Sequence, residues 1–293
     1  MENPIPILFA PLQGYTDSLY RQLHHELVGG VQAYFTPFLR WEKGGLRAKD
    51  RKELEPQGEV PTVVQVIACD REEMARLCDV VQQAGHSRID LNLGCPFPLQ
   101  TRAGRGSALL PHPEKVAPLL REMEARPEVQ FSVKMRLGME QPDEWCALLP
   151  MLQETPLRLL TVHARIARQQ YAGEPQMEQF ERLYESCTLP LAYNGDLTTP
   201  AQIAALQHRF PRLRAVMIGR GLLARPTLAQ EYRSQEAYSL PRRLAIAKAM
   251  HQRILASPLD PSQRLTHIRA LWEYQEALLD KRSYKNLMKT GRM

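Results

Sequence analysis

The sequence predicts a TIM barrel, an eight-stranded parallel β-barrel wrapped in helices, followed by a small helical domain. Eight short apolar runs rich in Val, Ile and Leu recur between residues 6 and 219, and most precede a stretch with helical periodicity. Such runs indicate parallel strands with both faces covered. Eight of these units in about 230 residues fit the size of this barrel. A doubly wound sheet is the competing architecture, because it needs fewer strands.

The predicted strands are five to eight residues long and cover residues 6–11, 33–38, 62–67, 88–93, 129–136, 158–163, 189–194 and 215–219. Most are followed by a predicted helix with apolar residues at helical spacing. Asp17 and Asp70 stand where a carboxylate accepts a backbone N–H at a helix start. The predicted helices cover residues 18–27, 71–84, 113–125, 143–154, 176–187 and 199–210.

After about residue 240 the pattern is helical, with no strand between the helices. We therefore predict a barrel domain of residues 1–235 and a short helical domain of residues 236–293. The second domain is rich in Lys and Arg, which form either solvated helix faces or a platform for phosphate groups. These basic residues are Arg242, Arg243, Lys248, Arg253, Arg264, Arg269, Lys281, Arg282, Lys285, Lys289 and Arg292.

Composition narrows the class of protein. The formal net charge of +6 leans toward polyanionic partners such as nucleic acid, although many basic proteins bind none. Five scattered cysteines without a CxxC or CxxxC pair predict a reducing compartment, no disulfide framework and no metal site. The N-terminus lacks a basic n-region, and no apolar run approaches the roughly 20 residues of a membrane span. We expect a soluble cytoplasmic protein.

Polar or turn-forming residues follow seven of the predicted strands. In a barrel all these strand ends lie on one face, which is where barrel enzymes carry their active sites. The sequence therefore predicts a functional site there. The residues are Pro11, Leu12, Gln13, Gly14, Gln65, Asn92, Cys95, Lys134, Arg136, His163, Arg165, Asn194, Gly195, Asp196, Gly219, Arg220 and Gly221.

The last two strand ends carry glycines, in "YNGD" and "IGRG". Barrels often bind a phosphate between the loops after strands seven and eight, where glycine N–H groups approach it closely. Arg220 adds a charge that can pair with a phosphate. Each glycine alone fits ordinary turn chemistry. Together they predict a cofactor that carries a phosphate.

Lys134 and Gln65 lie in otherwise apolar strands and are predicted to point inward. A buried lysine needs an anionic partner. A flavin provides one, since its reduced form is negatively charged, and the glutamine amide suits the flavin's pyrimidine edge. The alternatives are an ion pair between Lys134 and Asp90, and a core glutamine satisfied by backbone groups.

Cys95 follows its strand between Gly94 and Pro96. A cysteine that only fills space is expected within the strand, and no partners are spaced for a metal, so an acid or nucleophile on the working face fits better. His163 also ends a strand and is a candidate to bond a carbonyl of the substrate or flavin. A structural histidine is the alternative.

These groups, in this order, resemble the tRNA-dihydrouridine synthases over roughly residues 5–225. "APLQGYTDSLYR" is similar to that family's A-P-M-x-G-x-T-D segment. "DLNLGCPFPLQTRAGRGSALL" resembles its D-x-N-x-G-C-P signature with the following G-x-G-x-x-L loop. "SVKMRLG", "LLTVHARIARQQYAG", "LPLAYNGDL" and "AVMIGRG" match the later motifs.

The resemblance implies an FMN-binding TIM barrel that reduces the C5–C6 double bond of a uridine in tRNA, with NADPH re-reducing the flavin. It implies hydride delivery to C6 by FMN and protonation of C5 by Cys95. The positions matching flavin contacts are Pro11, Leu12, Gln13, Gln65, Lys134, His163, Asn194, Gly195, Asp196, Gly219 and Arg220. Those matching substrate or RNA contacts are Arg40, Asn92, Arg136, Arg165 and Tyr171.

Arg40 enters this set because "TPFLRW" resembles a stretch of the bacterial C-type subgroup. That likeness implies position 16 of the tRNA D-loop as the target. Three departures stand out: "VQVIACD" replaces the usual Q-L-x-G, "HARI" replaces H-G-R-T, and the helical domain is short. The first departure changes the loop that covers the flavin, and the second removes a hydroxyl from it. Because the helical domain grips RNA in the family, its short length bears on target choice. Arg102 and Arg105, in the glycine-rich loop, either meet RNA phosphates or belong to a solvated turn.

The uridine must leave its stack to reach a face recessed in a barrel, so the tRNA has to present a splayed-out base. We expect a monomer. Three other readings stay open: the same reaction on ribosomal RNA, an FMN barrel that reduces a small molecule such as an ene-reductase or dihydroorotate-type enzyme, and an RNA-binding factor without reductase activity.

Overall fold

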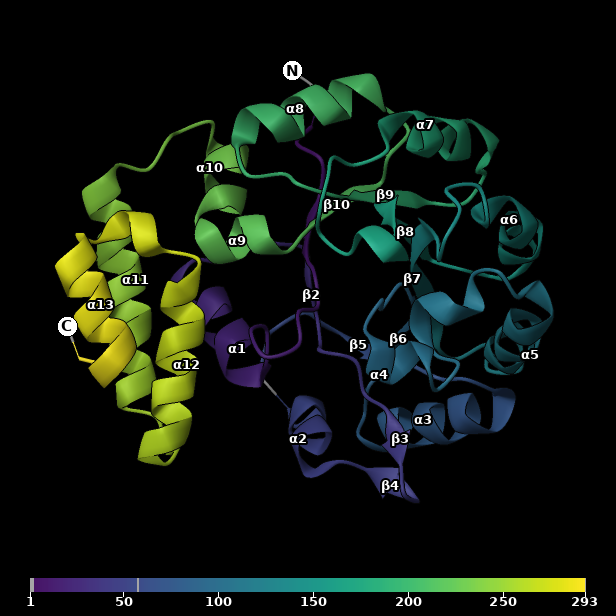
Figure 1. The fold of residues 1–293 in the computed structure, drawn as a ribbon, viewed down its shortest axis with the longest axis horizontal. Coiled ribbons are helices and arrows are strands. Elements are labelled where there is room, and N and C mark those ends of the chain that lie inside the picture. Colours follow the sequence, from purple (N-terminus) through teal and green to yellow (C-terminus); the bar gives the residue numbers. More distant parts are fainter. Residues whose placement is uncertain (1–2, 57, 293) are drawn as a thin grey trace.

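Eight parallel strands close into a barrel (Figure 1), which confirms the predicted fold class. The computed structural model describes residues 3–56 and 58–292. Strand β1 pairs with both β10 and β2, and this closure excludes the doubly wound sheet. The barrel strands are β1 (Ile7–Phe9), β2 (Ala33–Phe35), β5 (Thr62–Val66), β6 (Arg88–Leu93), β7 (Gln130–Gly138), β8 (Leu159–Ile166), β9 (Leu191–Asn194) and β10 (Ala215–Ile218).

Helices surround the barrel (Figure 1). Asp17 and Asp70 cap two of them as predicted, because their carboxylates accept the backbone N–H groups of Tyr20 and Glu73. The helices that follow barrel strands are α1 (Ser18–Leu27), α3 (Arg71–Gln83), α5 (Pro113–Glu124), α6 (Trp145–Glu154), α7 (Met177–Ser186), α8 (Pro200–Arg209), α9 (Arg220–Ala224) and α10 (Leu228–Ser234).

The short elements of the connecting loops escaped the sequence-based prediction. Strands β3 (Trp41–Glu42) and β4 (Gly45–Leu46) form a hairpin whose two loop residues have positive φ angles. Strand β2 ends earlier than expected, since Pro37 has no N–H for a ladder bond. The other short elements are α2 (Ala48–Arg51), α4 (Pro98–Thr101), and the 3₁₀ helices η1 (Lys52–Leu54), η2 (Gly106–Leu109), η3 (Ala167–Gln169) and η4 (Glu276–Leu278).

Three helices form the C-terminal part of the chain: α11 (Leu240–Leu255), α12 (Pro261–Glu273) and α13 (Lys281–Thr290). They gather beside α1 at one side of the barrel (Figure 1). Arg253 on α11 pairs with Glu26 on α1 at 2.6 Å. The predicted domain boundary at 235/236 falls between α10 and α11 and stays a prediction. No helix of the described residues is long and apolar enough to span a membrane.

The lower part of the barrel interior is filled with small and apolar side chains. They are Leu8, Ala10, Ala33, Phe35, Val63, Ala192, Ala215 and Met217. A second and larger apolar layer lies between the strands and the helices. Buried polar side chains also occur within the barrel strands, among them Asp90, Ser132 and Thr161, and further polar residues gather at the carboxyl ends of the strands.

Candidate active site

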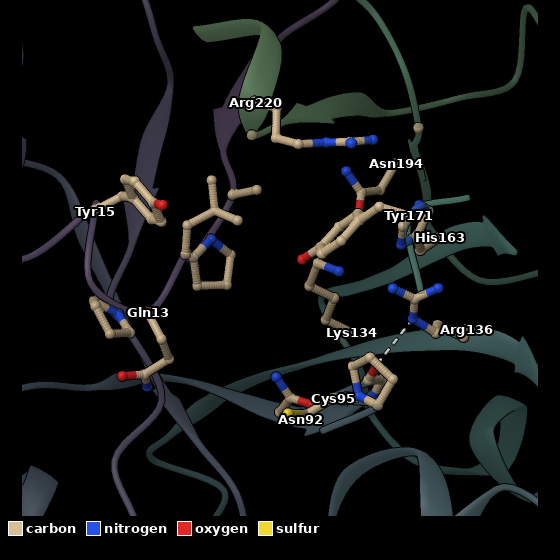
Figure 2. A pocket seen from close by; sticks show the side chains of 18 of the residues that line it. Gln13, Tyr15, Asn92, Cys95, Lys134, Arg136, His163, Tyr171, Asn194 and Arg220 are labelled. Atoms are coloured by element: carbon tan, nitrogen blue, oxygen red, sulfur yellow. Dashed lines mark hydrogen bonds between the residues drawn. The ribbon is translucent and has the colours of Figure 1, made fainter. Parts of the chain in front are cut away.

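A pocket of about 690 Å³ opens at the carboxyl ends of the barrel strands (Figure 2). Gln13 and Tyr15 lie on one side of it, and Lys134, Arg136 and Tyr171 lie on the other. Its lining includes all eleven positions predicted for a flavin, namely Pro11, Leu12, Gln13, Gln65, Lys134, His163, Asn194, Gly195, Asp196, Gly219 and Arg220. Cys95, Asn92, Arg136 and Tyr171 also line it.

Two of the predicted substrate residues, Arg40 and Arg165, do not line this pocket. Both are buried. The Nε of Arg40 lies 2.7 Å from a carboxylate oxygen of Glu42. Arg165 donates to Asp196 at 2.5 Å and to the carbonyl of Gly173 at 2.6 Å. Any effect of these arginines on a bound molecule therefore passes through their neighbours.

A hydrogen-bonded network of side chains joins strands β5, β6 and β7 beneath the pocket. Gln65 donates to Asp90 at 2.7 Å and accepts from the amide of Asn92 at 2.8 Å. Ser132 donates to the other oxygen of Asp90 at 2.6 Å. Burial raises the pKa of Asp90 to about 6, although both hydrogen bonds oppose that rise. Gln65 is thus satisfied by side chains, not by the backbone groups proposed as one alternative.

Lys134 faces the pocket without a close acidic partner. Within the described residues it forms no ion pair, and Asp90 is held by Gln65 and Ser132 instead. The proposed ion pair between Lys134 and Asp90 is therefore absent from this part of the chain. Burial, and the nearby charge of Arg136, lower the pKa of Lys134 to about 8. A buried cation in this state favours binding of an anion.

His163 is neutral in this setting. Burial, together with the cations Arg136 and Lys134, lowers its pKa well below the usual value. Arg165 lies 3.2 Å from Nε2 of His163 and can only donate. The tautomer with its proton on Nδ1 therefore fits the contact, which leaves an N–H for another acceptor.

The backbone around Cys95 is fixed by bonds from three directions. The amide oxygen of Asn92 accepts the N–H groups of Gly94 at 3.0 Å and Cys95 at 2.8 Å. Ser107 donates its N–H and its hydroxyl to the carbonyl of Cys95 at 3.1 and 2.9 Å. Arg136 donates to the carbonyl of Gly94 at 3.0 Å, the dashed line in Figure 2. Burial raises the pKa of the Cys95 thiol, so the thiol keeps its proton at neutral pH.

Replacing Gly106 with alanine is expected to destabilise the protein more than replacing Gly104. Both have positive φ, so either change costs about 1–2 kcal/mol. A Cβ on Gly106 would also lie 2.8 Å from the carbonyl oxygen of Cys95, which adds about 1–3 kcal/mol. At Gly104 the nearest atom is 3.9 Å away. Urea unfolding of both variants measures the difference, and equal losses would contradict the close packing of Gly106 on Cys95.

The two arginines of the glycine-rich loop differ. Arg105 donates to both carboxylate oxygens of Glu73 and to the carbonyl of Trp41 at 2.9 Å. Its guanidinium is mostly buried. Contact of Arg105 with RNA phosphates stays a prediction, and in this structure its Nε and Nη2 groups are already engaged by Glu73 and Trp41. Arg102 is exposed.

The loops after β8, β9 and β10 meet around Asp196. This carboxylate accepts hydrogen bonds from Arg165 at 2.5 Å and from Arg220 at 2.6 Å. Burial opposes ionisation of Asp196, but the bonds and charges of the two arginines lower its pKa. The guanidinium of Arg220 lies 4.5 Å above the ring of Tyr171. A Cβ on Gly221 would lie 2.0 Å from the carbonyl oxygen of Leu197, so glycine lets the loops after β9 and β10 meet.

The pocket also contains aromatic residues that the sequence reasoning missed. Tyr15 and Tyr274 line it, and their rings meet edge to face at 5.3 Å. Tyr15 also donates to Glu273 at 3.0 Å. Tyr15 directly follows the "PLQG" strand end, which is a usable signal. Tyr274 follows helix α12 of the C-terminal part, and no local pattern predicts that it reaches the pocket.

The family model described as dihydrouridine synthase (Dus) matches residues 8–292. Over 228 residues the chain is 29% identical to tRNA-dihydrouridine synthase B of Pasteurella multocida, covering 76% of this chain and 67% of that one. It is 28% identical over 276 residues to the probable tRNA-dihydrouridine synthase 1 of Synechocystis, covering 92% and 73%. The B enzyme of Escherichia coli K12 is 28% identical over 229 residues, covering 77% and 70%.

Solved structures with the same fold are more distant in sequence. Morphinone reductase in complex with tetrahydroNAD superposes with a TM-score of 0.58 at 11% identity, covering 82% of this chain and 89% of that one. The old yellow enzyme from Trypanosoma cruzi gives 0.56 at 9% identity, covering 80% and 89%. At such identities the likeness shows the barrel fold alone.

Proposed function

Because the chain belongs to the dihydrouridine synthase family, we propose that it reduces specific uridines in tRNA to 5,6-dihydrouridine, with FMN as cofactor and NADPH as reductant. The supporting observation is that one pocket collects Cys95 and all eleven positions matched to flavin contacts. Its volume of about 690 Å³ lies in the range of cofactor sites. Incubation of the purified protein with FMN, NADPH and unmodified tRNA tests the proposal, with dihydrouridine measured by mass spectrometry.

The donors of the pocket suit a flavin with a phosphate. Lys134 would face the part of the ring that becomes anionic, and Gln65 the pyrimidine edge. Gly195 and Gly219 would bring backbone groups close to the phosphate. Arg220 would pair with the phosphate in competition with Asp196. When bound, FMN supplies the reducing equivalents for the uracil ring.

Cys95 would supply a proton to the reacting base. Burial keeps its thiol protonated at neutral pH, and a general acid must carry its proton at the start of the reaction. The bonds from Asn92 and Ser107 hold the backbone of Cys95 in one position. Pre-organisation of this kind lowers the entropic cost of placing the acid against the substrate.

Three of the five predicted substrate residues, Asn92, Arg136 and Tyr171, would contact the splayed-out uridine directly. Arg165 would act by orienting His163 and Asp196, since its guanidinium is engaged behind them. Arg40 lies against Glu42, so a role in reading position 16 of the D-loop stays a prediction. The monomeric state and the cytoplasmic location also stay predictions.

The same assay, run with other substrates, tests the two alternatives in which the substrate is ribosomal RNA or a small molecule. Ribosomal RNA fragments in place of tRNA test the first of these alternatives. The small-molecule hypothesis predicts that an ene or dihydroorotate-type substrate stimulates NADPH oxidation and that tRNA does not change the rate of this oxidation. The reading as an RNA-binding factor without activity fits poorly with the gathering of Cys95, Lys134 and His163 in one pocket.

Changing Lys281, Arg282 and Lys285 on α13 to glutamine is expected to weaken tRNA binding. All three side chains are exposed. The plot of log affinity against log salt concentration has a negative slope, and the loss of about three phosphate contacts makes that slope shallower by about 2–3. Fluorescence anisotropy at several salt concentrations measures it. Changing Lys49, Arg51 and Lys52 on the barrel removes the same charge as a control. Equal effects of the two triple variants would contradict an RNA platform on α13.

A further inference from the structure

An exposed aromatic side chain stands beside the buried thiol. Among the described residues, five large apolar side chains are exposed: Phe97, Leu99, Tyr171, Leu240 and Leu255. Phe97 is 48% exposed and lines the pocket, whereas Cys95, two residues earlier, is only 6% exposed. The chain therefore passes from the interior of the pocket to its mouth within two residues.

The backbone at Phe97 is rigid. It lies between Pro96 and Pro98, whose rings fix their own φ angles and restrict the residue before Pro98 to extended geometry. Phe97 has φ −71° and ψ 133°, in agreement with that restriction. Its carbonyl accepts the N–H groups of Gln100 at 2.8 Å and Thr101 at 3.1 Å. An aromatic ring on such a segment loses little backbone entropy when it binds a partner.

Resting on the proposed function, we propose that Phe97 stacks on the RNA base next to the reacting uridine and so holds that uridine out of its stack. Two residues separate the Cα atoms of Cys95 and Phe97 by at most about 7 Å. Successive bases along a strand lie about 3.4 Å apart when stacked and farther apart when splayed. With the uracil at Cys95, the neighbouring base therefore lies within reach of Phe97.

The surroundings of Phe97 agree with an RNA partner. Arg102 is exposed on the same loop, and within the described part of the chain it forms no ion pair. Proteins that bind single-stranded RNA combine aromatic rings that stack on bases with cations that pair with phosphates, and this loop carries one of each. A base of any identity presents a π-face, so Phe97 would hold the strand without selecting its sequence.

The test compares Phe97→Ala, Phe97→Trp and Leu99→Ala in dihydrouridine formation on unmodified tRNA. Phe97→Ala is expected to raise KM for tRNA roughly 5- to 100-fold, with a much smaller change in kcat. Phe97→Trp is expected to restore a KM near that of the wild type, because indole also stacks. Leu99 is 68% exposed but lies outside the pocket lining, so Leu99→Ala is the matched control and should leave KM unchanged.

Other outcomes would overturn the inference. An unchanged KM in Phe97→Ala, or an equal increase in Leu99→Ala, would mean that Phe97 does not stack on the RNA. If Phe97→Trp did not restore the KM for tRNA, Phe97 would contribute by packing against other parts of the protein and not by stacking on a base. Loss of bound FMN from Phe97→Ala, seen in its visible spectrum, would place the residue against the cofactor instead. Absence of dihydrouridine with the wild-type protein would refute the proposed function itself.

Discussion

Cys95→Ala is expected to lower dihydrouridine formation by roughly 100- to 10,000-fold while FMN stays bound, because the variant lacks its general acid. Within the described residues, Cys95 is the one thiol that lines the pocket. Single-turnover assays with NADPH-reduced enzyme and unmodified tRNA measure the effect. Since burial raises the thiol pKa, the wild-type rate should hold through neutral pH and fall only above that pKa.

Cys146→Ala provides the matched control, since this cysteine is exposed on α6 and lies outside the pocket. It should leave the rate unchanged. Normal turnover by Cys95→Ala would remove the thiol from the mechanism. Loss of bound FMN in that variant would instead indicate that Cys95 supports the cofactor site.

Lys134→Met is expected to stabilise the FMN-free protein by about 1–3 kcal/mol at pH 7, because it removes a buried charge whose desolvation the attraction of Asp90 offsets only in part. The same change should weaken FMN binding. Burial lowers the pKa of Lys134 to about 8, against 10.5 when unperturbed, so folding disfavours its charged form. This penalty is fully present below pH 8 and disappears as pH rises to 10.5. Urea unfolding of both proteins at pH 8 and at pH 10.5 measures the penalty as a difference in the free energy of unfolding. FMN titration measures the affinity for the cofactor.

Lys115→Met is the control on α5, where the side chain is exposed. It should change neither the free energy of unfolding nor the FMN affinity. A less stable Lys134→Met protein at pH 7 would show that Lys134 has a favourable partner without FMN. A stability difference that stayed the same between pH 8 and 10.5 would mean that the lysine pKa is not lowered.

Local chemistry explains what the sequence could predict. Strand β6 (Arg88–Leu93) matches its predicted bounds, because an apolar run ends there at a Gly-Cys-Pro turn. The carboxylates of Asp17 and Asp70 accept backbone N–H groups only three positions later in the chain, so these helix caps depend on local sequence. The site was predictable because a parallel barrel brings its strand ends to one face.

Contacts between distant residues explain what was missed. Arg105 looked free in the sequence, but Glu73 on α3 takes its guanidinium. Arg165 stays a predicted substrate residue, and its ion pair with Asp196 is the contact that the sequence reasoning missed. These pairings depend on the three-dimensional arrangement of loops. No spacing in the sequence encodes them.

The edge-to-face contact of Tyr15 with Tyr274 has a consequence for modular redesign. Tyr274 belongs to the C-terminal helical part but forms a wall of the barrel pocket. A chimera that received a foreign helical part would also receive a foreign residue in the wall of the pocket. The C-terminal helices and the pocket therefore cannot be exchanged independently at this position.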